Sequence, residues 1–147
     1  MKALQLVNRR TGHTIASTVE IADTRRSRNR GLLGRAGLDA SAALVLTPCC
    51  AIHTASMRFA IDVVFIDREG RVVRIVNDLA PWRAAWAVRA HAVVELAGGR
   101  LRPNELLVGD AVYLVPVEAE GDEGDEGAGR SSASSPWRMT AATHHPS

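Results

Sequence analysis

The sequence predicts a mainly β domain, an antiparallel sandwich or barrel-like sheet of about seven short strands with one or two short helices. Three observations predict this class. Short segments rich in β-branched and other apolar residues recur along the chain. Glycine, aspartate and asparagine, the residues typical of turns, separate these segments. The long helical patterns that parallel β-α-β units require between strands do not occur among them.

The first expected strands form a hairpin. Residues 2–7 and 13–21 carry apolar side chains at alternating positions, and residues 8–12 between them are rich in turn-forming types. A short apolar strand follows at 43–47 and is closed by Pro48, which cannot donate to a strand ladder.

The clearest strand signal is a pair at 61–67 and 71–79, joined by the turn sequence DREG. β-Branched residues fill both segments, and Gly70 suits a left-handed turn position. Two more strands are expected at 90–96 and 111–117, which completes the sheet.

Two short helices are expected between strands. The first follows Asp23 or Thr24, either of which can cap a helix N-terminus, and ends near Gly34. The second comprises at most two turns around 103–107, where Pro103 suits the first helical position. Neither is long enough to define the fold.

The first expected helix is unusual in its charge. Its N-terminal half holds four arginines, Arg25, Arg26, Arg28 and Arg30, although the helix dipole disfavours cations there. One interpretation is a solvated helix, partly neutralised by nearby acidic residues. The other is an anionic ligand bound beside it, with Arg30 among its contacts.

The 147 residues predict one domain, at 1–118, and a disordered tail at 119–147. The tail is rich in Gly, Ser, Ala and acidic residues, and no apolar period marks a face that could be buried. Residues 1–118 hold 16 basic and 11 acidic side chains, so the net charge of the expected domain is near +5.

Arginine outnumbers lysine 17 to 1, which favours a coding bias over phosphate recognition as the explanation. Aromatic residues make up only 4%, which disfavours a nucleic-acid partner that stacks its bases.

The sequence favours a cytoplasmic monomer without a membrane segment. No run approaches the roughly 18 apolar residues of a membrane span. The apolar stretch near the N-terminus is too short for a signal peptide. The adjacent cysteines Cys49 and Cys50 can form neither a disulfide framework nor a four-cysteine zinc site. We expect no cofactor.

The segment 48–62 concentrates the side chains that could carry chemistry: Cys49, Cys50, His53, Met57, Arg58 and Asp62. Its cysteines, histidine and methionine could bind copper(I), and the first two types could bind zinc. A cysteine could instead act as a nucleophile with His53 as its base and Asp62 as the orienting group. Adjacent cysteines could also form a strained redox-active disulfide. The simplest interpretation is that a cysteine and Met57 fill the core and His53 ends a strand.

Strand alternation places Asp62 on the same face as Val64 and Ile66. If that face is buried, the carboxylate needs a partner, and Arg58 or His53 could serve. Trp82 and Trp86 could wall a ligand groove beside arginines, but we expect them to cover the open end of the sheet.

Several segments together resemble the DUF192 family, also called UPF0127. They are GLLGR at 31–35, HTASMRFAIDVVFIDREGRVV at 53–73, Pro81-Trp82, VVELAGG at 93–99 and GD at 109–110. The resemblance covers roughly 20–116 and implies a mainly β domain with a short helix after its first hairpin. It implies no established activity, cofactor or substrate. The chain differs from the commoner family pattern, in which an aromatic-rich stretch stands at 53–58. The matching positions are His53, Met57, Arg58, Asp62, Asp67, Gly70, Gly98, Gly109 and Asp110.

The leading hypothesis is a non-enzymatic domain that binds a small ligand or a protein partner near 49–62. The expected ligand-binding residues are His53, Met57, Arg58, Asp62 and Arg30. The alternative is a thiol- or metal-dependent hydrolase that uses Cys49 or Cys50 with His53 and Asp62; a metal would be held by Cys49, Cys50, His53 and Met57.

Overall fold

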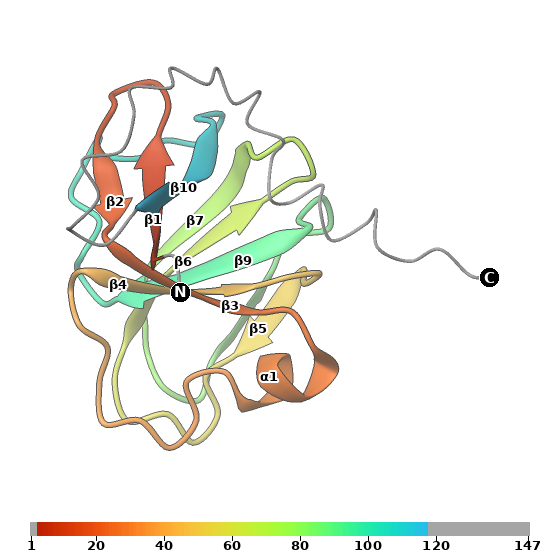
Figure 1. Cartoon of the computed structure of the whole chain (residues 1–147). Coiled ribbons are helices and arrows are strands. Elements are labelled where there is room, and N and C mark those ends of the chain that lie inside the picture. Colours follow the sequence, from red (N-terminus) through yellow and green to blue (C-terminus); the bar gives the residue numbers. More distant parts are fainter. Residues whose placement is uncertain (1–2, 118–147) are drawn as a thin grey trace.

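Ten strands and one helix form three sheets in the computed structural model, which describes residues 3–117 (Figure 1). The tail expected at 119–147 lies outside the described residues. In chain order the elements are β1 (Ala3–Asn8), β2 (Thr14–Ala16), β3 (Thr18–Ala22), α1 (Arg25–Arg30), β4 (Ala42–Leu46), β5 (Ala51–His53), β6 (Ile61–Ile66), β7 (Val72–Leu79), β8 (Ala84–Trp86), β9 (Ala92–Ala97) and β10 (Val112–Val117).

A five-stranded sheet in the order β3-β4-β9-β6-β7 forms the middle of the molecule. Every residue of β6 is buried, as are the first five residues of β9. Both strands are covered on two faces, which explains why they read as apolar runs rather than as alternating patterns. Two separate hydrophobic clusters, one on each face, account for this burial.

One face of the central sheet packs against the three-stranded sheet β10-β1-β2. Leu6 of β1 and Ile15 of β2 meet Val64 and Val94 of the central sheet in a single cluster. Figure 1 shows these three strands stacked to one side of β6 and β9. The hydrophobic cluster between these two sheets is the larger of the two cores.

A small layer covers the other face of the central sheet. It consists of the two-stranded sheet β5-β8 and the segment from α1 to Leu32. Ile52 of β5 and Ala85 of β8 pack in one cluster with Val63 and Phe65 of β6. In Figure 1, α1 and β5 lie beside each other under the sheet. The pocket described below lies in this layer.

The predicted 61–67 and 71–79 hairpin is confirmed, with β6 and β7 as its antiparallel arms. Gly70 has φ +84°, the left-handed conformation that the turn requires. The Asp67 side chain accepts hydrogen bonds from the backbone N–H groups of Glu69 (2.8 Å) and Arg71 (3.0 Å). Asp67 therefore belongs to the turn, as its residue type indicated.

The predicted strand at 13–21 is in fact two strands that belong to different sheets. β2 pairs with β1, whereas β3 pairs in parallel with β4. The chain changes sheet at Ser17, where the backbone N–H groups of Ser17 and Thr18 both donate to the Ser41 carbonyl. The central sheet is consequently mixed, because this one parallel pair joins strands that are otherwise antiparallel.

Short elements account for the other differences from prediction. The three-residue strands β5 and β8 were not expected, because so few residues show no recognisable period. The segment 103–107 forms turns rather than a helix. The helix α1 has its N-cap at Thr24, one of the two predicted positions, but ends at Arg30, with Gly31 as its C-cap, instead of near Gly34. Ten strands replace the expected seven or so within residues 3–117.

A polar cluster joins β1 to the start of β10. The buried Asp110 carboxylate accepts hydrogen bonds from Arg10 Nε (2.8 Å), Asn8 Nδ2 (3.0 Å) and the Leu107 backbone N–H (2.9 Å). These hydrogen bonds, chiefly the one from Arg10, lower the pKa of Asp110 to about 2. The Gly-Asp motif at 109–110 thus has a structural role.

Candidate functional site

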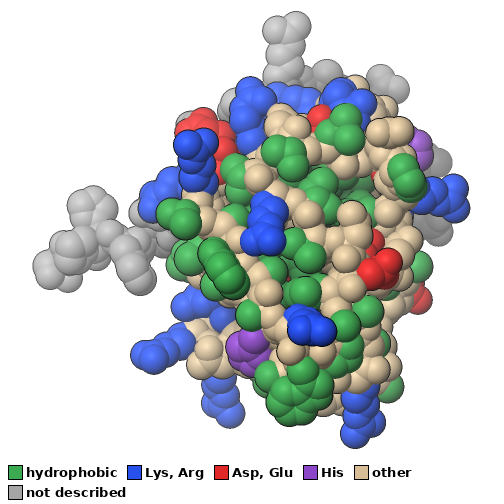
Figure 2. Space-filling view, turned by 180° about the vertical axis from the view of Figure 1, so that it is seen from behind, with side chains coloured by type: hydrophobic (Ala, Val, Ile, Leu, Met, Phe, Trp, Pro, Cys, Tyr) green, Lys and Arg blue, Asp and Glu red, His purple; other side chains and the backbone are tan. Residues whose placement is uncertain are grey.

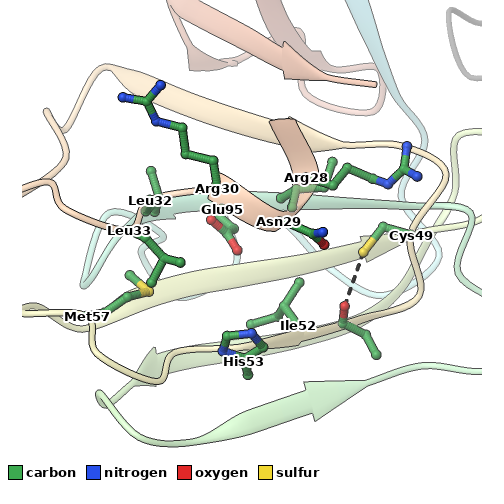
Figure 3. A pocket seen from close by; sticks show the side chains of 13 residues that line it. Arg28, Asn29, Arg30, Leu32, Leu33, Cys49, Ile52, His53, Met57 and Glu95 are labelled. Atoms are coloured by element: carbon green, nitrogen blue, oxygen red, sulfur yellow. Dashed lines mark hydrogen bonds between the residues drawn. The ribbon is translucent and has the colours of Figure 1, made fainter. Parts of the chain in front are cut away.

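A pocket with a volume of about 280 Å³ lies between α1 and β5. Its floor is formed by the central sheet, and its walls are formed by α1, the turn after it and β5 (Figure 3). Apolar and polar side chains are mixed along its surface. The lining residues are Arg28, Asn29, Arg30, Gly31, Leu32, Leu33, Leu46, Cys49, Ala51, Ile52, His53, Met57 and Glu95.

Capping and anchoring interactions hold α1 over this pocket. Thr24 accepts from the Ser27 backbone N–H (3.0 Å), and the Ser27 hydroxyl completes a capping box. The Arg28 guanidinium donates to the carbonyl of Asp23 (2.9 Å) and, at 3.4 Å, to that of Thr47. No residue of α1 itself is buried. Leu32, only 2% exposed, therefore anchors this segment to the core.

Glu95 is the buried acid of the pocket. It lies in β9 opposite Leu44 of β4 and Val63 of β6, so its side chain faces α1 and β5. The residue is 4% exposed, and its Oε2 has no hydrogen-bond partner among the described residues. Burial raises the pKa of Glu95 to about 7, although the nearby positive charge of Arg35 opposes the shift. At neutral pH the group is thus poised between its two protonation states.

Cys49 and Met57 contribute sulfur atoms to the pocket wall. The Cys49 thiol donates a hydrogen bond to the Ala51 carbonyl at 3.1 Å. Burial raises the pKa of this thiol, which favours the neutral form over the nucleophilic thiolate. Met57 is buried and packs in the core cluster beneath the pocket.

His53 ends β5 and is exposed at the edge of the pocket. Its backbone pairs with Ala84 of β8, which fixes the side of the strand that the imidazole occupies. Figure 3 shows the ring below the cavity, with the Glu95 carboxyl between it and α1. The prediction that His53 terminates a strand agrees with this placement.

The structure brings together only part of the residue set that the sequence suggested. Arg30, Cys49, His53 and Met57 line the pocket. Cys50 and Arg58 are exposed and do not line it. Within residues 3–117, no group of three or more His, Cys, Asp or Glu side chains is arranged to hold a metal ion.

Asp62 is fully buried and points to the other face of the central sheet. Its Oδ1 accepts from the backbone N–H groups of Asp78 (2.9 Å) and Gly99 (3.1 Å). Its Oδ2 accepts from the Leu101 N–H (2.9 Å). The expected partners Arg58 and His53 were therefore wrong, because backbone amides of β7 and of the loop after β9 take their place. Asp62 does not belong to the pocket.

A family model matches residues 6–114, which is most of the chain. The model is that of DUF192, described as an uncharacterized ACR. The chain belongs to the DUF192 family. The resemblance seen in the sequence is thereby confirmed.

Two solved structures share the fold of this DUF192 domain. A protein of unknown function from Novosphingobium aromaticivorans is 20% identical, with a TM-score of 0.65 over 76% of this chain and 83% of that one. A protein from Sinorhizobium meliloti, described as a "putative transcription regulator", is 19% identical, with a TM-score of 0.66 over 76% and 92%. At these identities the likeness concerns the fold alone. A search of curated proteins gave no match.

Glu95 is the functional candidate of the DUF192 domain that the sequence analysis missed. A signal was present, because Glu95 is the one charged residue in the apolar run Val93-Val94-Glu95-Leu96. A charged side chain in a strand buried on both faces needs a partner or a function. Asn29 and Leu33 also line the pocket, but only because α1 and the turn after it lie beside it. Their residue types gave no such signal in the sequence.

The expectation that Trp82 and Trp86 cover the open end of the sheet is wrong. They are 71% and 60% exposed. In β8 the alternation turns Ala85 inward and Trp86 outward, so a small residue closes this part of the core. Neither tryptophan lines the pocket under α1.

A larger hollow, about 820 Å³, lies among the loops near Thr11 and Pro103. Its acidic residue, Glu105, is already bonded to Arg100 Nη1 (2.8 Å) and the Arg102 N–H (3.0 Å). Figure 2 shows positive side chains spread over one side of the molecule and around its outline, without a single concentrated patch. Among the described residues no helix is long and apolar enough to cross a membrane. The pocket with Glu95 remains the strongest candidate site of the DUF192 domain.

Proposed function

We propose that this DUF192 domain binds a small polar ligand in the pocket between α1 and β5. The observation that carries the proposal is the buried Glu95 carboxyl, whose Oε2 has no partner among the described residues at the floor of the cavity. Buried polar atoms of native proteins are nearly always hydrogen-bonded, and an orphan atom at the floor of a pocket is a site for a ligand group.

The composition of the pocket supports recognition of a small molecule. Leu33, Ile52 and Met57 supply apolar walls, while Asn29 and His53 offer polar groups near the opening. Ligand sites typically combine a mainly apolar lining with a few polar groups that fix the orientation of the ligand. A volume of about 280 Å³ is small for such a site, so the ligand is small.

The arrangement supports binding more strongly than catalysis. The hydrolase alternative needs a thiolate, a base and an orienting acid in one place. Cys49 and His53 share the pocket, but burial keeps the pKa of the thiol raised, and Asp62 is bound to backbone amides on the other face of the sheet. These observations favour a binding domain.

Nuclear magnetic resonance with a library of small fragments tests the proposal. We expect fragment-induced chemical-shift changes that centre on α1, β5 and β9 in the full chain. An Asn29→Trp variant places a bulky side chain over the pocket and should abolish these changes. Arg26→Trp, on the same helix but outside the pocket, is the matched control and should leave them intact. Fragments that bind only elsewhere, or binding that persists in Asn29→Trp, would contradict the proposal.

A further inference from the structure

We infer that the ligand is a small zwitterion, a linear amino acid whose ammonium group binds the Glu95 carboxylate and whose carboxylate group binds at the mouth beside Arg30. The inference rests on the proposed function and adds the chemical class of the ligand. Three parts of the pocket support it: the floor, the mouth and the wall between them.

The floor offers an acceptor that lacks a cation. Glu95 Oε2 has no hydrogen-bond partner among residues 3–117. The nearby cation Arg35 is held by Glu20, with 2.7 Å between its Nη2 and Oε2 of that residue. A ligand ammonium group would supply both N–H donors and the positive charge that a buried carboxylate requires. A neutral hydroxyl group would supply a donor without the charge.

The mouth offers a cation that lacks an anion. Arg28 is engaged with the Asp23 and Thr47 carbonyls, whereas Arg30 forms no ion pair within the described part of the chain. Figure 3 shows the Arg30 guanidinium extending away from the cavity, on a long side chain that can turn toward a bound anion. Two arginines at the mouth disfavour a purely cationic ligand. An anionic group at the outer end of the ligand removes this repulsion.

The wall between floor and mouth is apolar. Leu33, Ile52 and Met57 lie along it, and each would contact a methylene stem of the ligand. The distance from Glu95 to the mouth selects the length of that stem. An ω-amino acid series, in which only the number of methylenes changes, therefore measures this distance.

Binding of the ammonium group should depend on pH through Glu95. An ammonium ligand binds the carboxylate form, and the pKa of Glu95 in the folded protein without ligand is about 7. Affinity should therefore rise about tenfold from pH 6 to pH 8. The other charged or titratable residues that line the pocket are Arg28 and Arg30 from α1, Cys49, and His53 from β5, and Arg35 from the turn after α1 lies near the carboxyl. If a His53→Gln variant keeps the same rise of affinity with pH, that pH dependence belongs to Glu95.

Isothermal titration calorimetry of the full chain tests the inference. The probes are glycine, β-alanine, 4-aminobutyrate and 6-aminohexanoate, with n-alkylamines and n-alkanoates of matched length. We expect one zwitterion to bind at least about tenfold more tightly than the matched amine or acid, since each lacks one charged contact.

Variants separate the two ends of the site. Glu95→Gln should abolish the preference for an ammonium group and the rise in affinity with pH. Arg30→Gln should abolish only the preference for a carboxylate group. Arg26→Gln, on the same helix but outside the pocket, should change neither. Because Arg30 is exposed, its variant tests the mouth even if Glu95→Gln folds poorly.

Three outcomes would overturn the inference. The first is an alkylamine or alkanoate that binds as tightly as the zwitterion. The second is zwitterion binding that is unchanged in Glu95→Gln. The third is a series in which no member binds while neutral fragments still perturb the pocket, which would leave the proposed function standing. If fragments also fail to perturb the pocket, both proposals are wrong.

Discussion

Two buried carboxylates on neighbouring strands of the same sheet have opposite surroundings. Asp62 of β6 points toward the large core and accepts three backbone N–H groups, from Asp78, Gly99 and Leu101. Glu95 of β9 points toward the small layer, and its Oε2 has no partner among the described residues. Both residues are less than 5% exposed.

The comparison shows that the hydrogen-bond partners of a buried acid indicate its role. Asp62 binds backbone amides of β7 and of the loop after β9, so its oxygens are occupied by the protein itself. Glu95 faces a cavity, and burial makes its charged form costly. Extent of burial alone would not separate the two residues, whereas the partners of their oxygen atoms do.

The largest expected effect is that of Asp62→Ala. The substitution leaves three N–H groups without their acceptor and opens a small void, which should lower the free energy of unfolding by about 4 kcal/mol. Urea unfolding followed by circular dichroism measures this loss. Asp67→Ala, in the exposed turn, should cost about 1 kcal/mol. Equal losses at the two positions would contradict the structural role of Asp62.

Glu95→Gln should remove a pH dependence of stability. The pKa of Glu95 is about 7 in the folded protein against 4.5 for the free group, so the folded state holds its proton more tightly. Between these values the contribution of Glu95 to the free energy of unfolding falls as pH rises, by up to about 3 kcal/mol, and this contribution is greatest below pH 4.5. Urea midpoints at pH 5 and pH 8 should therefore differ more for the wild type than for Glu95→Gln. Identical differences in the two proteins would show that Glu95 is not the group responsible.

Gly98→Ala should weaken the loop that binds Asp62. A Cβ atom at Gly98 would lie 2.9 Å from the Ala60 carbonyl oxygen, closer than backbone atoms tolerate. Displacing this loop also strains the bond from the Gly99 N–H to Asp62. We expect a loss of about 2 kcal/mol in thermal or urea unfolding. The control is Gly37→Ala, where a Cβ atom meets open space and the melt should barely change.

The smallest effect concerns the reactivity of the two cysteines. Cys50 is exposed, whereas Cys49 is partly buried and burial raises the pKa of its thiol. Iodoacetamide at pH 8 should therefore alkylate Cys49 roughly tenfold more slowly than Cys50. Mass spectrometry of Cys49→Ser and Cys50→Ser variants gives the two rates. A faster reaction at Cys49 would revive the hydrolase alternative.

The central hairpin could be predicted from sequence because its signals are local. β-Branched runs on either side of the Asp67–Gly70 turn suffice to predict β6 and β7. Thr24 likewise predicted the start of α1. The three-residue strands β5 and β8 exist only because tertiary partners pair with them, so no local pattern announced them.

The candidate site was predicted in part. His53, Met57 and Arg30 lie where a ligand site was expected, since the segment 48–62 does border the pocket. The partners of Asp62 were predicted wrongly and Glu95 was not singled out, because in a strand covered on both faces alternation shows which residues share a side but not what covers that side.

The sequence by itself determined that this is a mainly β chain, where its main hairpin turns and to which family it belongs. Those properties follow from residue types and spacings within short stretches. Only the tertiary structure decided which acid is bound by the protein and which faces a pocket. That outcome depends on segments from distant parts of the chain, the end of β7 and the loop after β9, whose amides reach Asp62 and leave Glu95 to the cavity.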